Sequence, residues 1–290
     1  MPEFLTIGHI TRDMQAGGAF TLGGTVHFAA LTAYHLGLAA AIVTCADNDL
    51  APQLPALLPG ISLEVRPSAE TTTFANTYTE QGFRIQHLYA RGTQLTPLDV
   101  PPTWLDAPIV LLGPLAQELD ADFVTHIARR PGRIIAATPQ GWLRRWDDSG
   151  RVWPTPWLAA EQVLPALDVL ILSHDDLLPF ADGLRGEADA MLTRWSKHIP
   201  LLVATDGRHG ATLFQHGDTR RFPAYAAAEV DPTGAGDVFA AAFLTHLHRH
   251  HNAAEAVNFA NCVASFSIEQ PGVQGIPDLA LVQQRLHTIR

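Results

Sequence analysis

Cysteine is scarce in this 290-residue sequence, which contains only Cys45 and Cys262. Two cysteines this far apart form neither a disulfide framework nor the ligand spacing of a zinc site. Free cysteines are among the most frequently buried residues, so we expect both to lie in the core of a protein from a reducing compartment.

Charged residues are also few, at 17% of the chain, and the basic ones are outnumbered by the acidic ones, 19 against 29, which makes the formal net charge −10. A negative chain without a basic run is a poor candidate for binding nucleic acid or an anionic membrane. Hydrophobic residues make up 47%, so the chain can bury a large core and is not disordered as a whole. An anionic substrate would need a local site that overcomes the overall charge.

Long apolar segments are missing too. The residues from Met1 to Phe4 have no basic stretch and no long apolar run, unlike a signal peptide. The most apolar long stretch, residues 29–46, contains the turn residue Gly37 and is better explained as a helix, a turn and a strand than as a membrane span. We therefore expect a cytoplasmic protein. Its length allows one large domain or two ordinary ones.

Short apolar runs alternate with helical segments along the chain. The runs span residues 4–10, 41–45, 109–112, 133–136, 168–172 and 201–204, and the helical segments include 25–38, 120–130 and 187–198. Strands that are apolar throughout are typical of a parallel sheet covered on both faces. The alternation predicts an α/β fold with a mostly parallel sheet.

Two regions depart from this pattern. Residues 71–91 alternate, are rich in Thr, Phe and Tyr, and contain a turn signal at Gln81-Gly82, which predicts a β-hairpin. Such an excursion favours a flap over a site or an oligomer contact, with an edge hairpin of the main sheet as the alternative. Residues 140–157 are dense in Trp, Arg and Pro and predict an ordered loop packed by its own aromatic side chains.

The most distinctive segment is Asp231-Pro-Thr-Gly-Ala-Gly-Asp237, which precedes an apolar helix predicted from Val238. Gly234 and Gly236 allow a ligand to approach the backbone where N–H groups converge at a helix start, which favours a bound anion. Asp237 lies where it can take a proton from an alcohol aimed at a phosphoryl group. An ordinary glycine turn with a helix-capping charge explains these residues equally well. The segment is neither a P-loop nor a dinucleotide-binding turn.

This segment closely resembles the D-T-x-G-A-G-D signature of the ribokinase/PfkB family of carbohydrate kinases. Further similarities follow in order along the chain: Gly8 with Asp13, the pair Gly23-Gly24, the β-lid at 71–91, the nucleotide loop at 205–210, and Asn261 with the 271–277 tail. The resemblance implies a three-layer α/β/α sandwich with a mostly parallel central sheet and a small β lid. It implies a single kinase domain over residues 1–290, with 71–91 as an inserted hairpin lid.

The resemblance also implies an ATP-dependent kinase that phosphorylates a hydroxyl of a small sugar or inositol, with Mg²⁺ as cofactor and the use of a monovalent cation left open. By this resemblance, Asp237 would be the catalytic base and Asp176 would lie at the metal. The transferred phosphate would be bound by Gly234, Ala235 and Gly236. The acceptor would be bound by Asp13, Gly23, Gly24 and Phe28, and the nucleotide by Thr205, Gly207, Gly210 and Asn261. It also leaves open a homodimer formed through the lid.

Three positions depart from the family pattern. Pro232 replaces a threonine, Ser173 with Asp176 stands in place of the N-x-x-E motif, and Phe28 lies where many members have an asparagine. Phe28, together with the segment from Gln140 to Arg144, resembles the branch of the family that includes plant myo-inositol kinase. Two alternatives stay open: a nucleoside kinase in which Phe28 stacks on a base, and a non-catalytic ligand-binding relative.

Arg144 and a pair of histidines are further candidates for a functional role. Arg144 either reaches the active site or pairs at the surface. His246 and His250 share a helical face, but without a carboxylate at ligand spacing they do not predict a metal site.

Overall fold

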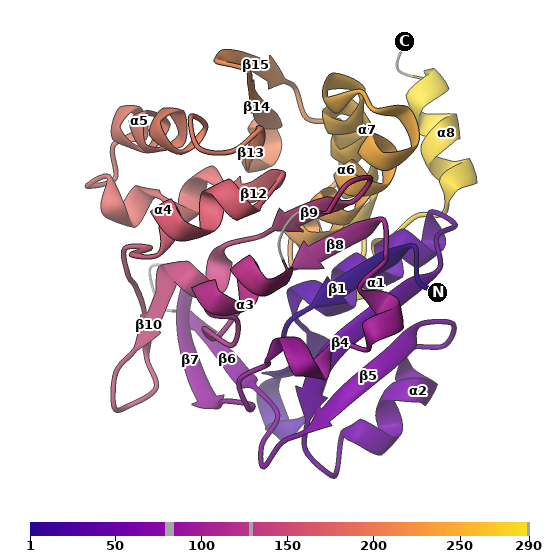
Figure 1. Cartoon of the computed structure of the whole chain (residues 1–290), viewed down its shortest axis with the longest axis vertical. Coiled ribbons are helices and arrows are strands. Elements are labelled where there is room, and N and C mark those ends of the chain that lie inside the picture. Colours follow the sequence, from indigo (N-terminus) through magenta and orange to yellow (C-terminus); the bar gives the residue numbers. More distant parts are fainter. Residues whose placement is uncertain (79–83, 128–129, 289–290) are drawn as a thin grey trace.

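A nine-stranded sheet forms the centre of the computed structural model, which describes residues 1–78, 84–127 and 130–288 (Figure 1). The strand order is β15-β14-β13-β12-β9-β8-β1-β4-β5; the strands from β13 to β5 are parallel, and β14 pairs antiparallel with both β13 and β15. The strands are β1 (Phe4–Ile7), β4 (Ala40–Ala46), β5 (Ser62–Pro67), β8 (Ile109–Leu112), β9 (Ile134–Ala137), β12 (Val169–Ser173), β13 (Leu201–Thr205), β14 (Ala211–Gln215) and β15 (Asp218–Phe222). The predicted α/β fold with a mostly parallel sheet is confirmed.

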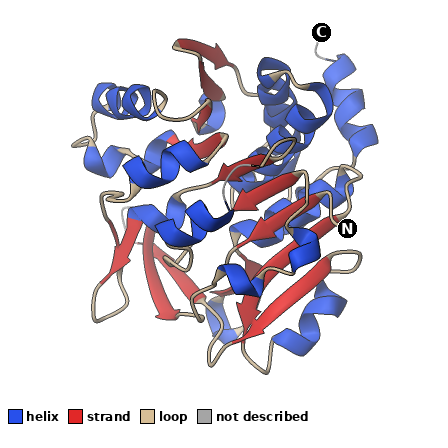
Figure 2. Cartoon of the chain, in the orientation of Figure 1, coloured by secondary structure: helices blue, strands red, loops and turns tan. Residues whose placement is uncertain are grey.

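Helices cover both faces of this sheet (Figure 2). Successive residues of a strand face opposite sides, so Phe4 belongs to one core and Leu5 to the other. The first core contains α1 (Thr25–His35), α6 (Ala235–His250), α7 (Ala253–Ser267) and part of α8 (Leu279–Thr288); the second contains α3 (Ala121–Ile127), α4 (Ala160–Val163) and α5 (Arg185–Trp195). A one-turn helix, α2 (Leu54–Leu57), lies near β5. Burial on both sides explains why the strands are continuous apolar runs.

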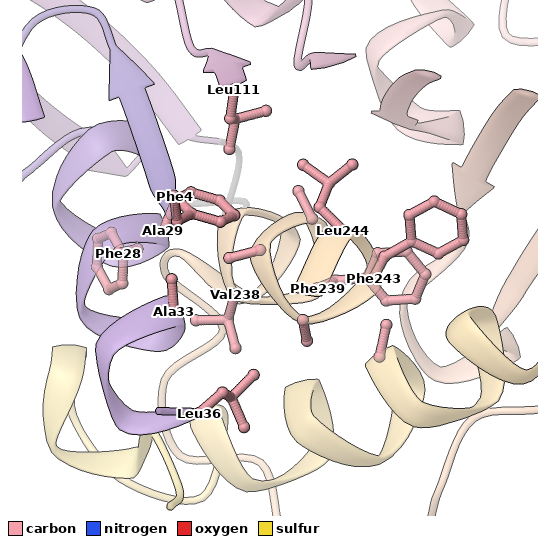
Figure 3. Packing of buried hydrophobic residues seen from close by; sticks show 14 of the residues in the cluster. Phe4, Phe28, Ala29, Ala33, Leu36, Leu111, Val238, Phe239, Phe243 and Leu244 are labelled. Atoms are coloured by element: carbon pink, nitrogen blue, oxygen red, sulfur yellow. The ribbon is translucent and has the colours of Figure 1, made fainter. Parts of the chain in front are cut away.

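Small side chains hold α1 close to α6. Figure 3 shows Ala29 and Ala33 of α1 on the side that faces Val238 of α6. The structure starts α6 at Ala235, three residues before the predicted start, because the glycine turn itself enters the helix. The other predicted helices are present with ends shifted by up to a few residues.

A second, four-stranded sheet lies apart from the main one, in the order β3-β2-β6-β7. Its strands are β2 (Thr11–Met14), β3 (Phe20–Gly23), β6 (Thr73–Tyr78) and β7 (Arg84–Ala90). The antiparallel pairing of β6 with β7 confirms the predicted hairpin strands, although the turn at Gln81-Gly82 lies outside the described residues. Because β6 pairs with β2, the alternative of an edge hairpin on the main sheet is wrong.

The segment 140–157 is not simply a loop, which corrects the prediction. It forms a short antiparallel hairpin from β10 (Arg144–Trp146) and β11 (Val152–Pro154). The rings of Trp142 and Trp157 stack at 4.9 Å, and Trp195 of α5 meets Trp157 edge-on at 5.5 Å. These aromatic side chains therefore anchor the hairpin in the core against α5 rather than packing only among themselves.

Both cysteines are buried and free, as expected. Burial raises the pKa of the Cys45 thiol to about 12. Within the described ranges, no helix is both long and apolar enough to cross a membrane.

Candidate active site

A cavity of about 480 Å³ lies where several parallel strands end. Thr138 follows β9, Ser173 ends β12 and Thr205 ends β13, and all three line the cavity. Ligands of open α/β sheets bind at this carboxyl edge, because the loops after parallel strands converge there. Side chains of the small sheet line the cavity from another side; Asn76 on β6 lies opposite Gln86 on β7, and the Gln86 amide donates to Asn76 Oδ1 at 3.2 Å.

The glycine turn before α6 forms another wall of this cavity. Gly234 adopts a φ of +76°, which favours glycine, and a Cβ there would collide with the ring of Phe28. Phe28 is 4% exposed, so its ring supports the turn from below as well as lining the cavity. The Asp231 carboxylate holds the start of the turn by accepting the N–H groups of Thr233 at 3.0 Å and Gly272 at 2.9 Å.

Not every N–H of the turn faces an incoming anion. The Ala235 N–H donates to the carbonyl oxygen of Pro232 at 3.2 Å, and Ala235 is not among the residues that line the cavity. Gly234 and Gly236 do line it. An anion would therefore meet the first turn of α6 mainly near Gly236, where helix N–H groups have no partner four residues earlier in the helix.

Asp237 occupies the first turn of α6 and lines the cavity. Thr25, at the start of α1, donates its hydroxyl to Asp237 Oδ1 at 2.8 Å. Desolvation by the surrounding protein raises the pKa of Asp237 from 3.8 to about 6; Thr25 and the positive charge of Arg144 oppose the rise, while the carboxylates of Asp176 and Asp13 add to it. A carboxylate with this pKa is mostly ionised at neutral pH and is a much better proton acceptor than an ordinary aspartate.

Asp13 on β2 faces the same cavity. The Thr11 hydroxyl donates to Asp13 Oδ1 at 3.0 Å. On the neighbouring strand β3, Gly23 lies so close that a Cβ would collide with the Asp13 carboxylate. The predicted glycine pair thus has two local roles: Gly23 leaves room for Asp13, and Gly24, with a φ of +97°, begins α1 and lines the cavity.

Only one of the four residues expected to bind the nucleotide lines this cavity. Thr205 lines it, whereas Gly207, Gly210 and Asn261 do not belong to its lining. Gly210 passes close to the backbone of β15, and a Cβ there would collide with the Phe222 carbonyl oxygen. Asn261 on α7 donates its side-chain amide to the Pro223 carbonyl at 3.1 Å.

Ser173 and Asp176 form a capping box after β12. The Asp176 carboxylate accepts the Ser173 N–H at 3.1 Å, and the Ser173 hydroxyl accepts the Asp175 N–H at 3.2 Å. Within the described part of the chain, no group of three or more His, Cys, Asp or Glu side chains is arranged to hold a metal. Asp176 nevertheless fits Mg²⁺, because this ion is commonly held by one or two carboxylates together with substrate phosphates and water.

His246 and His250 on α6 pack against each other and against α7. The His246 ring lies 4.3 Å from that of His250 and 4.6 Å from that of Phe259. Burial lowers the pKa of His246 to about 4.

Several cavity residues have no signal in the sequence. Thr25 lies 212 positions from Asp237, and Thr11, Asn76 and Gln86 belong to no motif. The sequence predicted either an active-site or a surface position for Arg144, and the structure places Arg144 in the cavity lining.

Part of the chain is similar to known carbohydrate kinases. Residues 149–279 match the family described as pfkB family carbohydrate kinase. Fructokinase-2 of Zea mays is 29% identical over 161 residues, which cover 51% of this chain and 48% of that protein. Inositol 3-kinase of Arabidopsis thaliana is 32% identical over 105 residues, covering 36% and 30%. The chain thus spans about half the length of the first curated relatives that it matches.

Among solved structures, a pyrophosphate-dependent kinase in the ribokinase family, complexed with a pyrophosphate analog and myo-inositol, superposes with a TM-score of 0.82. The superposition covers 97% of this chain and 99% of that one at 20% sequence identity. At this identity the likeness establishes the ribokinase-like fold.

Proposed function

We propose that the chain, of which residues 149–279 match the pfkB family of carbohydrate kinases, transfers a phosphoryl group to a hydroxyl of a small polyhydroxyl acceptor. The observation that carries the proposal is the position of Asp237. Its carboxylate lies in the cavity, in the first turn of α6, immediately after the glycine turn. A proton acceptor and an anion-binding helix start are thereby placed side by side.

The transfer assigns a role to each of these groups. The acceptor oxygen forms a bond to the terminal phosphorus of the donor while the bond from that phosphorus to the bridging oxygen breaks. The proton of the acceptor hydroxyl passes to Asp237, and the bridging oxygen leaves with the rest of the donor. The first-turn N–H groups near Gly234 and Gly236 orient the phosphoryl oxygens, so the negative charge is met by backbone dipoles.

A neutral sugar or inositol suits the acceptor side of the cavity. Asp13 can accept hydrogen bonds from ring hydroxyls, and the aromatic Phe28 can cover an apolar ring face. Among the described residues that line the cavity, four carry carboxylates, so an acidic acceptor would be repelled; they are Asp13, Asp176, Asp231 and Asp237. The hairpin β6–β7, with Asn76 and Gln86 turned to the cavity, acts as a lid that excludes water from the reaction.

The phosphoryl donor is the less determined partner. We propose ATP, bound along Thr205, Gly207, Gly210 and Asn261. Pyrophosphate is the second candidate, because the cavity lining reaches Thr205 but includes no residue of α7, and a similar structure is a pyrophosphate-dependent kinase. Asp176 would hold Mg²⁺ at the phosphates, where the ion supplies charge neutralisation.

A matrix of donors and acceptors tests the proposal. ATP and pyrophosphate are each combined with fructose, ribose, myo-inositol and adenosine, and the phosphorylated acceptor is detected by mass spectrometry. We expect turnover with a sugar or inositol. Phosphorylation of adenosine alone would identify the nucleoside kinase instead, and acceptor binding without product for any pair would identify a non-catalytic relative.

We also propose that the chain forms a single domain with residues 71–91 as its lid. A homodimer formed through the small sheet is a further proposal. Light scattering measures the oligomeric state directly. A monomer at working concentration would exclude the dimer.

A further inference from the structure

Arg144 is held firmly at the edge of the cavity. Its carbonyl oxygen accepts the Gln117 side-chain amide at 2.6 Å, and its backbone pairs with Pro154 in the β10–β11 hairpin. Just before it, Trp142 donates its indole N–H to the Leu119 carbonyl at 2.6 Å and stacks on a second buried tryptophan. A side chain that starts from so restrained a backbone loses little conformational freedom when it binds a ligand.

The loop before Arg144 is also held by contacts with the loop that follows β8. The Gly141 N–H donates to the Pro114 carbonyl at 2.8 Å, and the two chains approach so closely that a Cβ on Gly141 would lie 2.5 Å from the Leu115 nitrogen. Leu115 itself lines the cavity. The hairpin carrying Arg144 and the loop after β8 therefore form one wall.

The charges around the cavity are unbalanced. Among its described lining residues, four are aspartates, while Arg144 is the single lysine or arginine. A donor with several negative charges must enter a space with a surplus of carboxylates. Magnesium and the start of α6 offset part of this repulsion, and the Arg144 guanidinium on another wall supplies a side-chain cation.

We propose that Arg144 is a catalytic residue whose guanidinium contacts the oxygens of the phosphoryl group in transit. The inference rests on the proposed function. In the transferred group, charge spreads over three equatorial oxygens, and one planar guanidinium can donate to two of them. The first turn of α6 contacts the group from one wall and Arg144 from another. No bond or proton is exchanged with Arg144, which retains its charge throughout.

The closest alternative is that Arg144 donates to hydroxyls of the acceptor. The two roles differ in kinetics. Contacts made mainly in the transition state lower kcat when they are removed, whereas contacts to the bound acceptor raise its KM.

The test compares Arg144→Gln with Arg145→Gln in steady-state kinetics, using the donor and acceptor that the wild type turns over in the matrix. Arg145 is the neighbouring, exposed residue outside the cavity lining, so its substitution makes the same change of charge on the same strand. We expect Arg144→Gln to lower kcat about 10²- to 10³-fold with an acceptor KM within about threefold of wild type. Arg145→Gln should stay within about twofold in both, the size of change expected of an exposed charge.

A second variant guards against loss of folding. Arg144→Lys keeps the charge and the aliphatic stem but loses the planar fork, so we expect a folded protein, checked by circular dichroism, with kcat reduced about tenfold or more. Unchanged kcat in folded Arg144→Lys and Arg144→Gln would overturn the inference, as would a raised acceptor KM at constant kcat. Absence of turnover in the wild type would instead refute the proposed function.

Discussion

The carboxylate of Asp237 is predicted to be costly for stability and essential for turnover, and Asp237→Asn separates the two effects. The substitution keeps the shape of the side chain and still offers an oxygen to the Thr25 hydroxyl, which now donates to Asp237 Oδ1 at 2.8 Å. It removes the charge and the basic lone pair. Loss of a general base lowers kcat about 10²- to 10⁴-fold.

The effect on stability follows from the pKa of Asp237, which desolvation raises from 3.8 to about 6. Well below pH 3.8 the carboxyl is protonated in both the folded and the unfolded chain and costs nothing. As the pH rises, the unfolded chain ionises first, so stability is lost until the folded carboxyl has also ionised above pH 6. The full cost is about 3 kcal/mol, of which about half is reached by pH 5.

Asp237→Asn removes this cost, so the variant should be more stable than wild type at high pH. We expect a gain in the free energy of unfolding of about 1–3 kcal/mol at pH 8. The gain should be smaller by about 1 kcal/mol at pH 5. In a protein of this size each kcal/mol corresponds to about 2 °C in Tm.

The stability of Asp237→Asn relative to wild type is measured by thermal unfolding at pH 5 and at pH 8, followed by circular dichroism. Comparing this stability difference at the two pH values cancels any effect of the asparagine that does not depend on pH. Asp122→Asn is the matched control, because Asp122 also lies in the first turn of a helix but is exposed. The control should show no gain at pH 8. If Asp237→Asn has the same stability difference at both pH values, the carboxylate is not desolvated as argued. If it turns over at a tenth of the wild-type rate or faster, Asp237 is not the base.

Three further predictions concern the same cavity. Thr25→Val removes a hydrogen bond to the ionised carboxylate of Asp237, so the pKa of Asp237 should rise. The acidic limb of the profile of kcat/KM against pH should then move to higher pH, and an unmoved limb would contradict this. Gly234→Ala should destabilise the fold by about 1–3 kcal/mol in urea unfolding, because of the positive φ and the Phe28 ring, and Phe28→Ala should recover part of the loss when combined with it. Asp176→Asn should raise the Mg²⁺ concentration that gives half-maximal rate, and an unchanged magnesium titration would exclude a metal role for Asp176.

Local patterns in the sequence were sufficient for the layout of the fold. The continuous apolar runs correctly indicated the inner strands, because a strand buried on both faces has no polar side. The same rule missed β5, β14 and β15 at the two ends of the order. An outer strand such as Asp218–Phe222 is mostly exposed and so lacks the apolar signal.

The glycine turn, the helix after it and the position of Asp237 could also be predicted from the sequence, because each depends on a few adjacent residues, whereas Asp13 is indicated only by the resemblance to the family. Only the tertiary structure brought Thr25 to Asp237 and set Phe28 beneath Gly234. It also turned Arg144 into the cavity. These contacts depend on how α1, α6 and the β10–β11 hairpin pack, and side chains far apart in the chain leave no spacing from which such packing can be inferred.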